Sequence, residues 1–326
     1  MNIAILSNSV LPVTKYGGTE RIIWWLGEEL TKMGHKVTFI APEGTKSSFA
    51  KVIHYNLEIP LARQIPEETD IVHLYEKPKE PLSKPYIVMI QGNKNDFEAC
   101  DENTVFVSRN HAERYGSDAF VYNGLKLEEY GKPDFKVPRT HLHFLAKAAW
   151  RVKNVKGAIS IARASGNKLA VLGGTRLNIK MGFRFTPYPS ISFYGMIGGE
   201  EKNQLLRTSK GLLFPVLWHE PFGIAIIESM YMGSPVFGTP YGSLPELVPA
   251  GMGVLSDKKS VLIEALADVD SYDNKRCSEY IADNFTMAHT TRKYIEYYET
   301  VLNGRKINPT PPKLKEMPPK FLPFYE

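Results

Sequence analysis

The stretch of residues 218–233, WHEPFGIAIIESMYMG, decides how the rest of the chain is interpreted. Its first six residues predict a loop, and the apolar run after them predicts a helix over residues 224–232. The stretch holds two glutamates, Glu220 and Glu228, in strongly apolar surroundings. Buried carboxylates are unfavourable unless a partner pairs with them, and the hydroxyl groups of a ligand could be that partner. The alternative is an ordinary acid at a helix start followed by an ordinary acid on an amphipathic helix.

The start of the expected helix also suits an anion. The N–H groups of Phe222, Gly223 and Ile224 would lie in the first turn, where no helix carbonyl pairs with them. Such groups can bind a phosphate without any charged side chain. Glu220 would precede the helix, and Glu228 would lie further along it, where a carboxylate can accept two hydrogen bonds from a ribose diol.

Outward from this stretch, short apolar runs alternate with helical patterns in both directions. The expected strands are residues 2–7, 37–41, 71–74, 86–90, 104–107, 119–121, 143–146, 168–173, 191–194, 211–215 and 235–239. Helices are expected after residue 19, capped by Thr19 and ended by Gly34, and over residues 158–165 and 286–302. This alternation predicts parallel sheets covered by helices, an α/β architecture of doubly wound type.

A polar stretch rich in Gly and Pro follows Asn123-Gly124 and marks the domain boundary. We expect a first domain over residues 1–130 and a linker over 131–140. A second domain would follow over 141–285, then a helix over 286–304 that returns to the first domain, and a tail over 305–326. Ligands of doubly wound sheets bind beyond the carboxyl ends of the strands, so the main site is expected in a central cleft between the domains.

Composition narrows the class of protein. The chain has 326 residues, is 43% hydrophobic and carries a net charge of +5. Two cysteines, Cys100 and Cys277, give no disulfide framework and favour a reducing cytoplasm. Met1 leads directly into an apolar run without a basic segment, so we expect no signal peptide. No apolar run reaches 18 residues, so we expect no membrane span. The basic excess suits a phosphorylated small molecule or an anionic membrane surface, whereas nucleic-acid binding is disfavoured because its motifs are missing.

Several familiar motifs are absent or incomplete. The loop after the first strand lacks G-x-G-x-x-G, and no G-x-x-x-x-G-K-[ST] occurs. His219-Glu220 begins H-E-x-x-H, but Gly223 takes the place of the second His, so no zinc pair forms. Asp268-Val269-Asp270 resembles the D-x-D of metal-dependent sugar transferases, yet its position at a helix end predicts a solvated surface pair.

Two further groups of residues suit an anion. Gly17-Gly18 precede a helix and would let backbone N–H groups approach a phosphate, although a loop that merely needs glycine explains them equally well. Four cations, Lys147, Arg151, Lys153 and Lys156, follow a strand of the second domain. Position alone leaves phosphate binding and a solvated surface as equal alternatives for them.

The ordered set of motifs resembles the family 4 retaining glycosyltransferases of the GT-B fold, which have two Rossmann-like domains. The pieces are Gly17-Gly18-Thr19-Glu20, Asn123-Gly124, Glu220, Phe222-Gly223, Glu228, Gly233-Ser234-Pro235-Val236, Gly242-Ser243-Leu244-Pro245-Glu246 and a final crossing helix. They cover nearly the whole chain to about residue 302. The order of the motifs is specific, whereas each motif alone is not.

The resemblance implies a hexosyltransferase-like enzyme. It would transfer a sugar from a nucleotide diphosphate sugar to a hydroxyl acceptor with retained configuration, without cofactor or required metal. Lys153 matches the family's phosphate-binding lysine, and the neighbouring arginine of the family falls on Lys147, a departure that Arg151 could offset. Glu220 would hold the donor sugar, Glu228 the ribose, and Ile197 would contact the base. Lys153→Ala is then expected to cut turnover steeply without unfolding the domain.

The acceptor side departs further from the family. Many members have a His where this chain has Gln91, and glutamine cannot take a proton at neutral pH. Either the reaction needs no such base, or Gln91 only orients the substrates. Candidate acceptor-side residues are Tyr16, Gln91, Asn93 and Asn95.

Alternatives to a transferase are a nucleotide-sugar epimerase of the same fold and a non-catalytic nucleotide-sugar-binding protein. Incubation with donor alone separates the first, and erosion of donor residues would mark the second. The Pro- and Lys-rich tail is expected to be irregular. The alternative is that a cytoplasmic protein makes a peripheral contact with the inner face of an anionic membrane, through Lys313, Lys315, Lys320, Phe321, Leu322 and Phe324.

Overall fold

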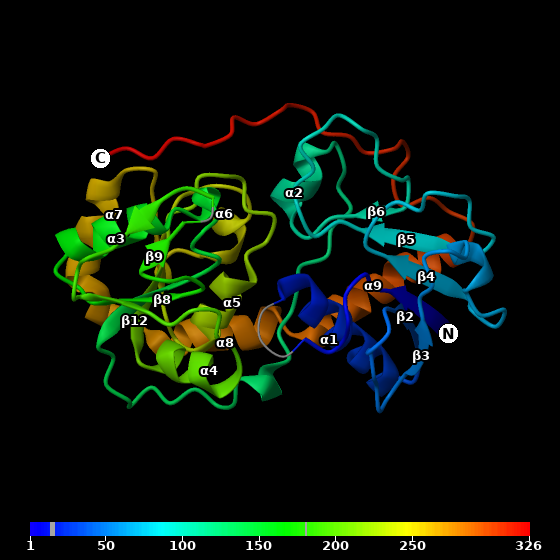
Figure 1. Ribbon diagram of the computed structural model, residues 1–326, viewed down its shortest axis with the longest axis horizontal. Helices are drawn as coiled ribbons and strands as arrows, with labels where there is room; N and C mark the ends of the chain where they lie inside the picture. The colour runs from blue at the N-terminus through cyan, green and yellow to red at the C-terminus, as the bar shows by residue number, and fades with distance from the viewer. Residues whose placement is uncertain (14–16, 180) are drawn as a thin grey trace. The chain divides into compact units, whose positions relative to one another are not determined.

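The computed structural model describes residues 1–13, 17–179 and 181–326 of the chain, so Tyr16 lies outside the described residues. The chain forms two compact units (Figure 1). The first comprises residues 1–13, 17–124 and 285–317, and the second comprises residues 125–284 and 318–326. The chain therefore passes from one unit to the other at Gly124, and residues 125–140 belong to the second unit.

The first unit is built on a sheet of six parallel strands in the order β3-β2-β1-β4-β5-β6. The strands are β1 (Asn2–Leu6), β2 (Lys36–Ala41), β3 (Lys51–His54), β4 (Ile71–Leu74), β5 (Tyr86–Met89) and β6 (Thr104–Val105). Residues 119–121, predicted as a strand, form only an isolated bridge between Phe106 and Phe120. The sequence did not reveal β3, because this edge strand is half-exposed and carries charged or polar residues at both ends.

Helix α1 (Gly18–Lys32) follows β1 and buries the apolar side that the periodicity predicted. The expected cap was wrong: Gly17 is the N-cap, and Thr19 lies inside the first turn. Gly27 lets this helix approach the sheet closely, since a Cβ there would lie 2.4 Å from a ring carbon of Phe39. The helix ends before Gly34, whose φ of 88° is left-handed.

Helix α9 (Met287–Leu302) belongs to the first unit and packs on α1 and β5. Thr286 caps it through a side-chain oxygen that accepts from the His289 N–H. Its buried face carries Tyr294 and Tyr298, and the Tyr298 hydroxyl lies 2.7 Å from Nδ1 of the buried His73. The smaller elements of this unit are η1 (Leu61–Arg63) and α2 (Arg109–Arg114).

The second unit contains another sheet of six parallel strands, in the order β11-β8-β7-β12-β13-β14. Its strands are β7 (His141–Leu145), β8 (Leu169–Leu172), β11 (Ile191–Phe193), β12 (Ser209–Phe214), β13 (Val236–Gly238) and β14 (Gly253–Leu255). Its helices are η2 (Leu127–Glu129), η3 (Arg151–Lys153), α3 (Val155–Ala164), α4 (Gly199–Arg207), α5 (Ile224–Tyr231), α6 (Leu244–Leu247), α7 (Lys259–Ala265), η4 (Leu266–Ser271) and α8 (Asn274–Asn284). The two doubly wound sheets confirm the predicted fold class.

Two features of the second unit concern motifs from the sequence. Asp268 and Asp270 are exposed at η4, and Asp270 pairs with Lys210 at 2.7 Å, so the D-x-D motif is a surface pair as expected. Between β8 and β11 lies a hairpin of β9 (Leu177–Asn178) and β10 (Arg184–Phe185), which the sequence had not suggested.

The tail, all of which the structure describes, carries no helix or strand beyond a single bridge, yet it is anchored. In the first unit, the Cys100 N–H donates to the Pro312 carbonyl at 2.7 Å, and Leu314 is buried. In the second unit, the Leu322 N–H donates to the Leu217 carbonyl at 2.8 Å. The irregular backbone was expected, whereas these contacts were not.

Candidate active site

The loop that follows β12 holds Glu220 in a fixed position. Gly223 adopts a left-handed conformation (φ 82°) and caps α5, which starts at Ile224. The backbone of Glu220 pairs with Gly242, and the Ser243 N–H donates to its carbonyl at 3.0 Å. A Cβ at Gly242 would lie 2.3 Å from the Glu220 backbone N and O, so only glycine permits this close approach. The G-S-L-P-E motif thus fixes the backbone that presents Glu220.

The Glu220 carboxylate forms a buried ion pair with Lys153. Lys153 Nζ donates to Glu220 Oε2 at 2.6 Å, and Trp218 Nε1 donates to the same oxygen at 2.8 Å. The two charged side chains are 11% and 6% exposed. The ammonium also lies 5.2 Å and 4.9 Å from the ring centres of Phe214 and Trp218. Carboxylate and aromatic faces together compensate the ammonium for the loss of water.

Glu228, on α5, is likewise paired within the protein. Its Oε1 accepts a hydrogen bond from the Tyr130 hydroxyl at 2.6 Å and another from Lys202 Nζ. The Lys202 and Glu228 side chains are 8% and 3% exposed. The Lys202 ammonium also lies over the Tyr130 ring, 4.9 Å from its centre. The sequence suggested ligand hydroxyls as partners for both acids, and the structure gives each acid a lysine of its own.

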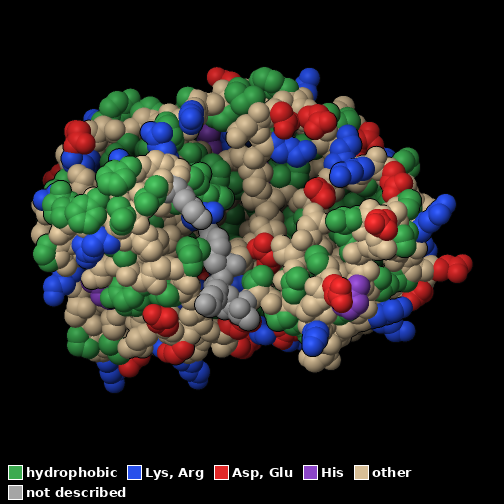
Figure 2. Space-filling model, viewed as in Figure 1, with side chains coloured by type: hydrophobic (Ala, Val, Ile, Leu, Met, Phe, Trp, Pro, Cys, Tyr) green, Lys and Arg blue, Asp and Glu red, His purple; other side chains and the backbone are tan. Residues whose placement is uncertain are grey.

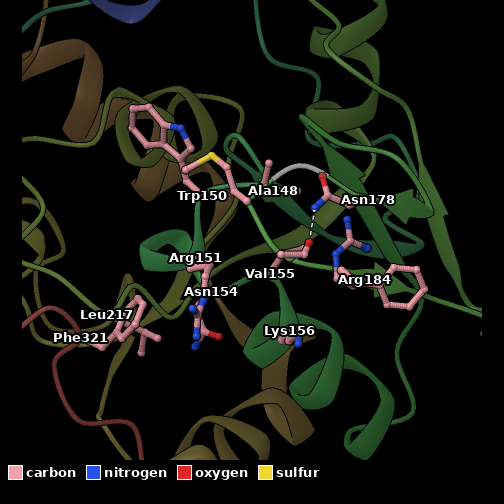
Figure 3. A pocket seen from close by; sticks show the side chains of 14 residues that line it. Ala148, Trp150, Arg151, Asn154, Val155, Lys156, Asn178, Arg184, Leu217 and Phe321 are labelled. Atoms are coloured by element: carbon pink, nitrogen blue, oxygen red, sulfur yellow. Dashed lines mark hydrogen bonds between the residues drawn. The ribbon is translucent and has the colours of Figure 1, made fainter.

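The other predicted cations lie elsewhere in the second unit. Lys147 Nζ lies 5.4 Å from the Trp150 ring centre, and the Arg151 guanidinium lies 4.9 Å from that of Phe321. Arg151 and Lys156 line a cavity of about 250 Å³ between η3, α3 and the hairpin (Figure 3). Of the three predicted catalytic cations, the structure places Lys153 against Glu220.

The remaining donor-side candidates occupy two settings. Phe222 is buried, and its carbonyl accepts from the Ser243 hydroxyl at 2.6 Å. Ile197 is half-buried in the connection between β11 and α4, the helix that carries Lys202.

In the first unit, Gly17 and Gly18 begin α1, and the chain's own Glu20 lies back over this helix start. A Cβ at Gly17 would lie 2.7 Å from Glu20 Oε2. Glu20 Oε1 accepts from the Ser9 hydroxyl at 3.2 Å. A carboxylate therefore already lies where a phosphate was expected, and an entering anion would meet its charge.

Three of the predicted acceptor-side residues, Gln91, Asn93 and Asn95, have neutral amide side chains. Gln91 and the buried Asn123 exchange two amide hydrogen bonds, 3.1 Å and 3.0 Å long. The Asn93 side-chain oxygen accepts from Arg114 at 2.9 Å, and Asn95 is exposed. Gln91 is thus held by an amide partner rather than by a charged group.

Residues 135–270 match the family model described as "Glycosyl transferases group 1". The matched residues all lie in the second unit. A Klebsiella pneumoniae protein, described as an uncharacterized 41.2 kDa protein in the cps region, is 25% identical over 118 residues. Those residues are 34% of this chain, and the match spans about a third (33%) of that curated relative.

Similar solved structures establish the fold of the whole chain as GT-B. AviGT4, a glycosyltransferase involved in avilamycin A biosynthesis, superimposes with a TM-score of 0.74 at 19% identity and covers 93% of this chain and 98% of its own. Sucrose-phosphate synthase from Thermosynechococcus elongatus gives 0.68 at 15%, covering 93% and 99%. HepE from Anabaena, in complex with UDP-glucose, gives 0.63 at 14%, covering 92% and 100%.

Within the second unit, sequence reasoning missed Lys202 and Tyr130. Lys202 lies on a helix with three other charged residues, so the composition of this helix resembles that of a solvated face. The only signal in the sequence is the spacing of Lys202 and Leu206, four residues apart on the buried side. Tyr130 lies in a stretch that looks like part of a linker.

The part of the chain that the structure describes has neither a metal-binding cluster nor a membrane-spanning helix. Over residues 1–13, 17–179 and 181–326, no group of three or more His, Cys, Asp or Glu side chains is placed to hold a metal ion. In the same part of the chain, no helix is both long and apolar enough to cross a bilayer.

Proposed function

We propose that the protein is a retaining glycosyltransferase that moves a sugar from a nucleotide diphosphate sugar to a hydroxyl acceptor without a metal. The observation that carries this proposal is the buried Lys153–Glu220 pair beside the start of α5, within the residues that match the group 1 family model. A buried ammonium next to a helix N-terminus can stabilise the negative charge that develops on a leaving diphosphate.

The proposed reaction breaks the bond between the sugar's anomeric carbon and the diphosphate oxygen. It forms a bond from that carbon to the acceptor oxygen, on the same face. The acceptor's proton passes to the leaving diphosphate oxygen, so Gln91 does not need to act as a base. This route is consistent with the neutral amide pair of Gln91 and Asn123.

Lys153 and Glu220 would exchange partners during binding. Before the donor enters, each neutralises the other at 2.6 Å. A diphosphate would draw the ammonium toward itself, and the Glu220 carboxylate would then accept hydrogen bonds from sugar hydroxyls. Trp218 Nε1, which donates to the same carboxylate, would keep it oriented during the exchange.

Glu228 would bind the ribose diol. Lys202 and Tyr130 both donate to its Oε1, which fixes the plane of the carboxylate. An oriented carboxylate loses less conformational entropy on binding than a mobile one. Ile197 would lie against the base, and UDP is the first nucleotide to test, because HepE was solved with UDP-glucose.

A thermal-shift panel of UDP-, GDP-, ADP- and CDP-linked sugars tests the donor site. One class should raise the melting temperature, with a ligand at 100 times its Kd adding about 2.7 kcal/mol of stability. EDTA should leave the shift unchanged. Glu228→Gln should abolish it, whereas Glu279→Gln, the same change at an exposed acid of α8, should not. No shift with any donor would overturn the proposal.

NMR of the products separates the alternatives. A retaining transferase with its donor and a hydroxyl acceptor yields a product with the donor's anomeric configuration. With donor alone it hydrolyses the donor slowly at most. Interconversion of the sugar without acceptor would identify an epimerase, and binding without any turnover across acceptor classes would identify a binding protein.

A further inference from the structure

The hairpin between β8 and β11 exposes a row of large apolar side chains. Leu177, Ile179, Met181, Phe183 and Phe185 alternate along it and are 50%, 75%, 59%, 72% and 56% exposed. The register pairs Leu177 with Phe185, so both ends of the row lie on one face. Lys180, inside the hairpin, lies outside the described residues. On the left of Figure 2, over the elements β8, β9 and α3 of Figure 1, hydrophobic side chains gather on the surface.

The polar side of the same hairpin is turned toward the protein. Arg184 is 7% exposed and donates to the Thr175 carbonyl and the Thr186 hydroxyl, both at 2.9 Å. Arg176 donates to the Ile191 carbonyl at 2.7 Å. This polarity is the reverse of an ordinary surface hairpin, in which the apolar face packs inward. The arginines hold the apolar face outward, so the exposure is a built feature of the fold.

The sequence segment that contains the hairpin carries charge of one sign. Residues 135–199 contain 11 lysines and arginines and no aspartate or glutamate. Against the chain's net charge of +5, the other residues together carry −6. Two of these cations, Arg151 and Lys156, are exposed and line the cavity shown in Figure 3. Met181 and Phe183 line the same cavity. Apolar side chains and exposed cations therefore lie together.

We infer that this hairpin docks the second unit onto an anionic lipid bilayer. Its apolar row would enter the acyl boundary, and Arg151, Lys156 and neighbouring cations would contact the headgroups. A nucleic acid or another soluble polyanion would satisfy the charges but leave five apolar side chains in water. A second copy of the chain would cover the apolar row but bring two cationic regions together.

The tail is less suited to this role. Phe321 and Leu322 are half-buried on the second unit, where the Arg151 guanidinium lies over the Phe321 ring. The membrane contact that the sequence suggested for the tail is therefore placed at the hairpin.

Vesicle co-sedimentation tests the inference. Wild-type protein should bind vesicles of equal parts phosphatidylglycerol and phosphatidylcholine at least 10-fold more tightly than vesicles of phosphatidylcholine alone. Phe183→Ser combined with Phe185→Ser should weaken binding to the anionic vesicles at least 10-fold. The matched control, Leu57→Ser with Ile59→Ser, removes exposed apolar groups of the first unit and should change nothing. Lys156→Gln should weaken binding about fivefold, the effect of one headgroup contact.

Several outcomes would overturn the inference. The first is that wild-type protein does not bind anionic vesicles, and the second is that the Leu57/Ile59 control loses as much vesicle binding as the Phe183/Phe185 variant. The third is vesicle binding that salt abolishes but that the Phe183/Phe185 change leaves intact. Light scattering that shows a dimer dissociated by that change would assign the hairpin to self-association instead.

A fluorescence measurement tests the same docking without changing the hairpin. Brominated acyl chains should quench wild-type tryptophan fluorescence, and Trp150→Phe, in the cavity lining, should remove most of the quenching. Absence of quenching would also contradict docking.

Discussion

The two units hold polar side chains near their strand ends by different means. In the second unit, Lys153–Glu220 and Lys202–Glu228 are buried ion pairs. In the first unit, the neutral side-chain amides of Gln91 and Asn123 hydrogen-bond to each other. The charged groups of a buried ion pair can each pair with a charged or polar ligand instead of with one another. A pair of neutral amides carries no charge to offer and only fixes the orientation of the two side chains. Under the proposed function, the second unit would stabilise the charge of the donor and the first would position the acceptor hydroxyl, and the difference suits these two roles.

Breaking the Lys153–Glu220 pair should have the largest effect. Lys153→Met leaves the Glu220 carboxylate buried without its ammonium and should lower the free energy of unfolding by about 3–5 kcal/mol. Urea denaturation measures this loss. The expectation from sequence, that removing Lys153 spares the fold, did not include the burial of this pair.

The double variant Lys153→Met/Glu220→Gln serves as the matched control. It removes both charges together, so most of the stability should return. Turnover should remain reduced by at least 100-fold, because the diphosphate has lost its ammonium. Lys275→Met, which breaks an exposed pair with Glu279, should change neither quantity measurably. A double variant as unstable as the single would refute the pairing argument.

The amide pair of the first unit should show a smaller version of the same pattern. Gln91→Leu leaves the buried Asn123 amide without its partner and should reduce stability by about 1–3 kcal/mol. Gln91→Leu with Asn123→Leu should restore much of that loss, since no buried polar group is then unpaired. A double-mutant cycle by urea denaturation gives the coupling. Additive losses would show that the two amides do not act as a pair.

The sequence predicted the sheets far better than the partners of the site residues. Strands such as β8 are continuous apolar runs buried on both faces, which leaves a clear pattern. Glu220 and Lys153 were identified through motifs, but their contact depends on the packing of η3 against the loop after β12. Lys202 and the hairpin escaped detection because a buried lysine in a charged helix, and an apolar face turned to solvent, both contradict the usual patterns.

The smallest effect concerns a histidine of the second unit and sharpens the same comparison. His143 lies fully buried in β7, with Nδ1 2.6 Å from the Ser209 hydroxyl and Nε2 2.7 Å from the Ser229 hydroxyl. Ser229 donates its own proton to the Ala225 carbonyl, which leaves its oxygen free to accept from an Nε2–H of His143. Burial lowers the pKa of His143 from 6.5 to about 3, and the ring stays neutral in the folded protein.

Above pH 6.5 the imidazole is neutral in both the folded and the unfolded chain, so its contribution to stability does not change with pH. Between pH 6.5 and about 3 only the unfolded chain takes up the proton, and the free energy of unfolding falls by up to about 1.4 kcal/mol per pH unit. His143→Gln keeps both hydrogen bonds without titrating, so urea denaturation from pH 7.5 to 5 should show a shallower acid slope than wild type. An unchanged slope would mean that His143 carries a proton when folded, which would be a buried charge outside the Lys153–Glu220 and Lys202–Glu228 pairs.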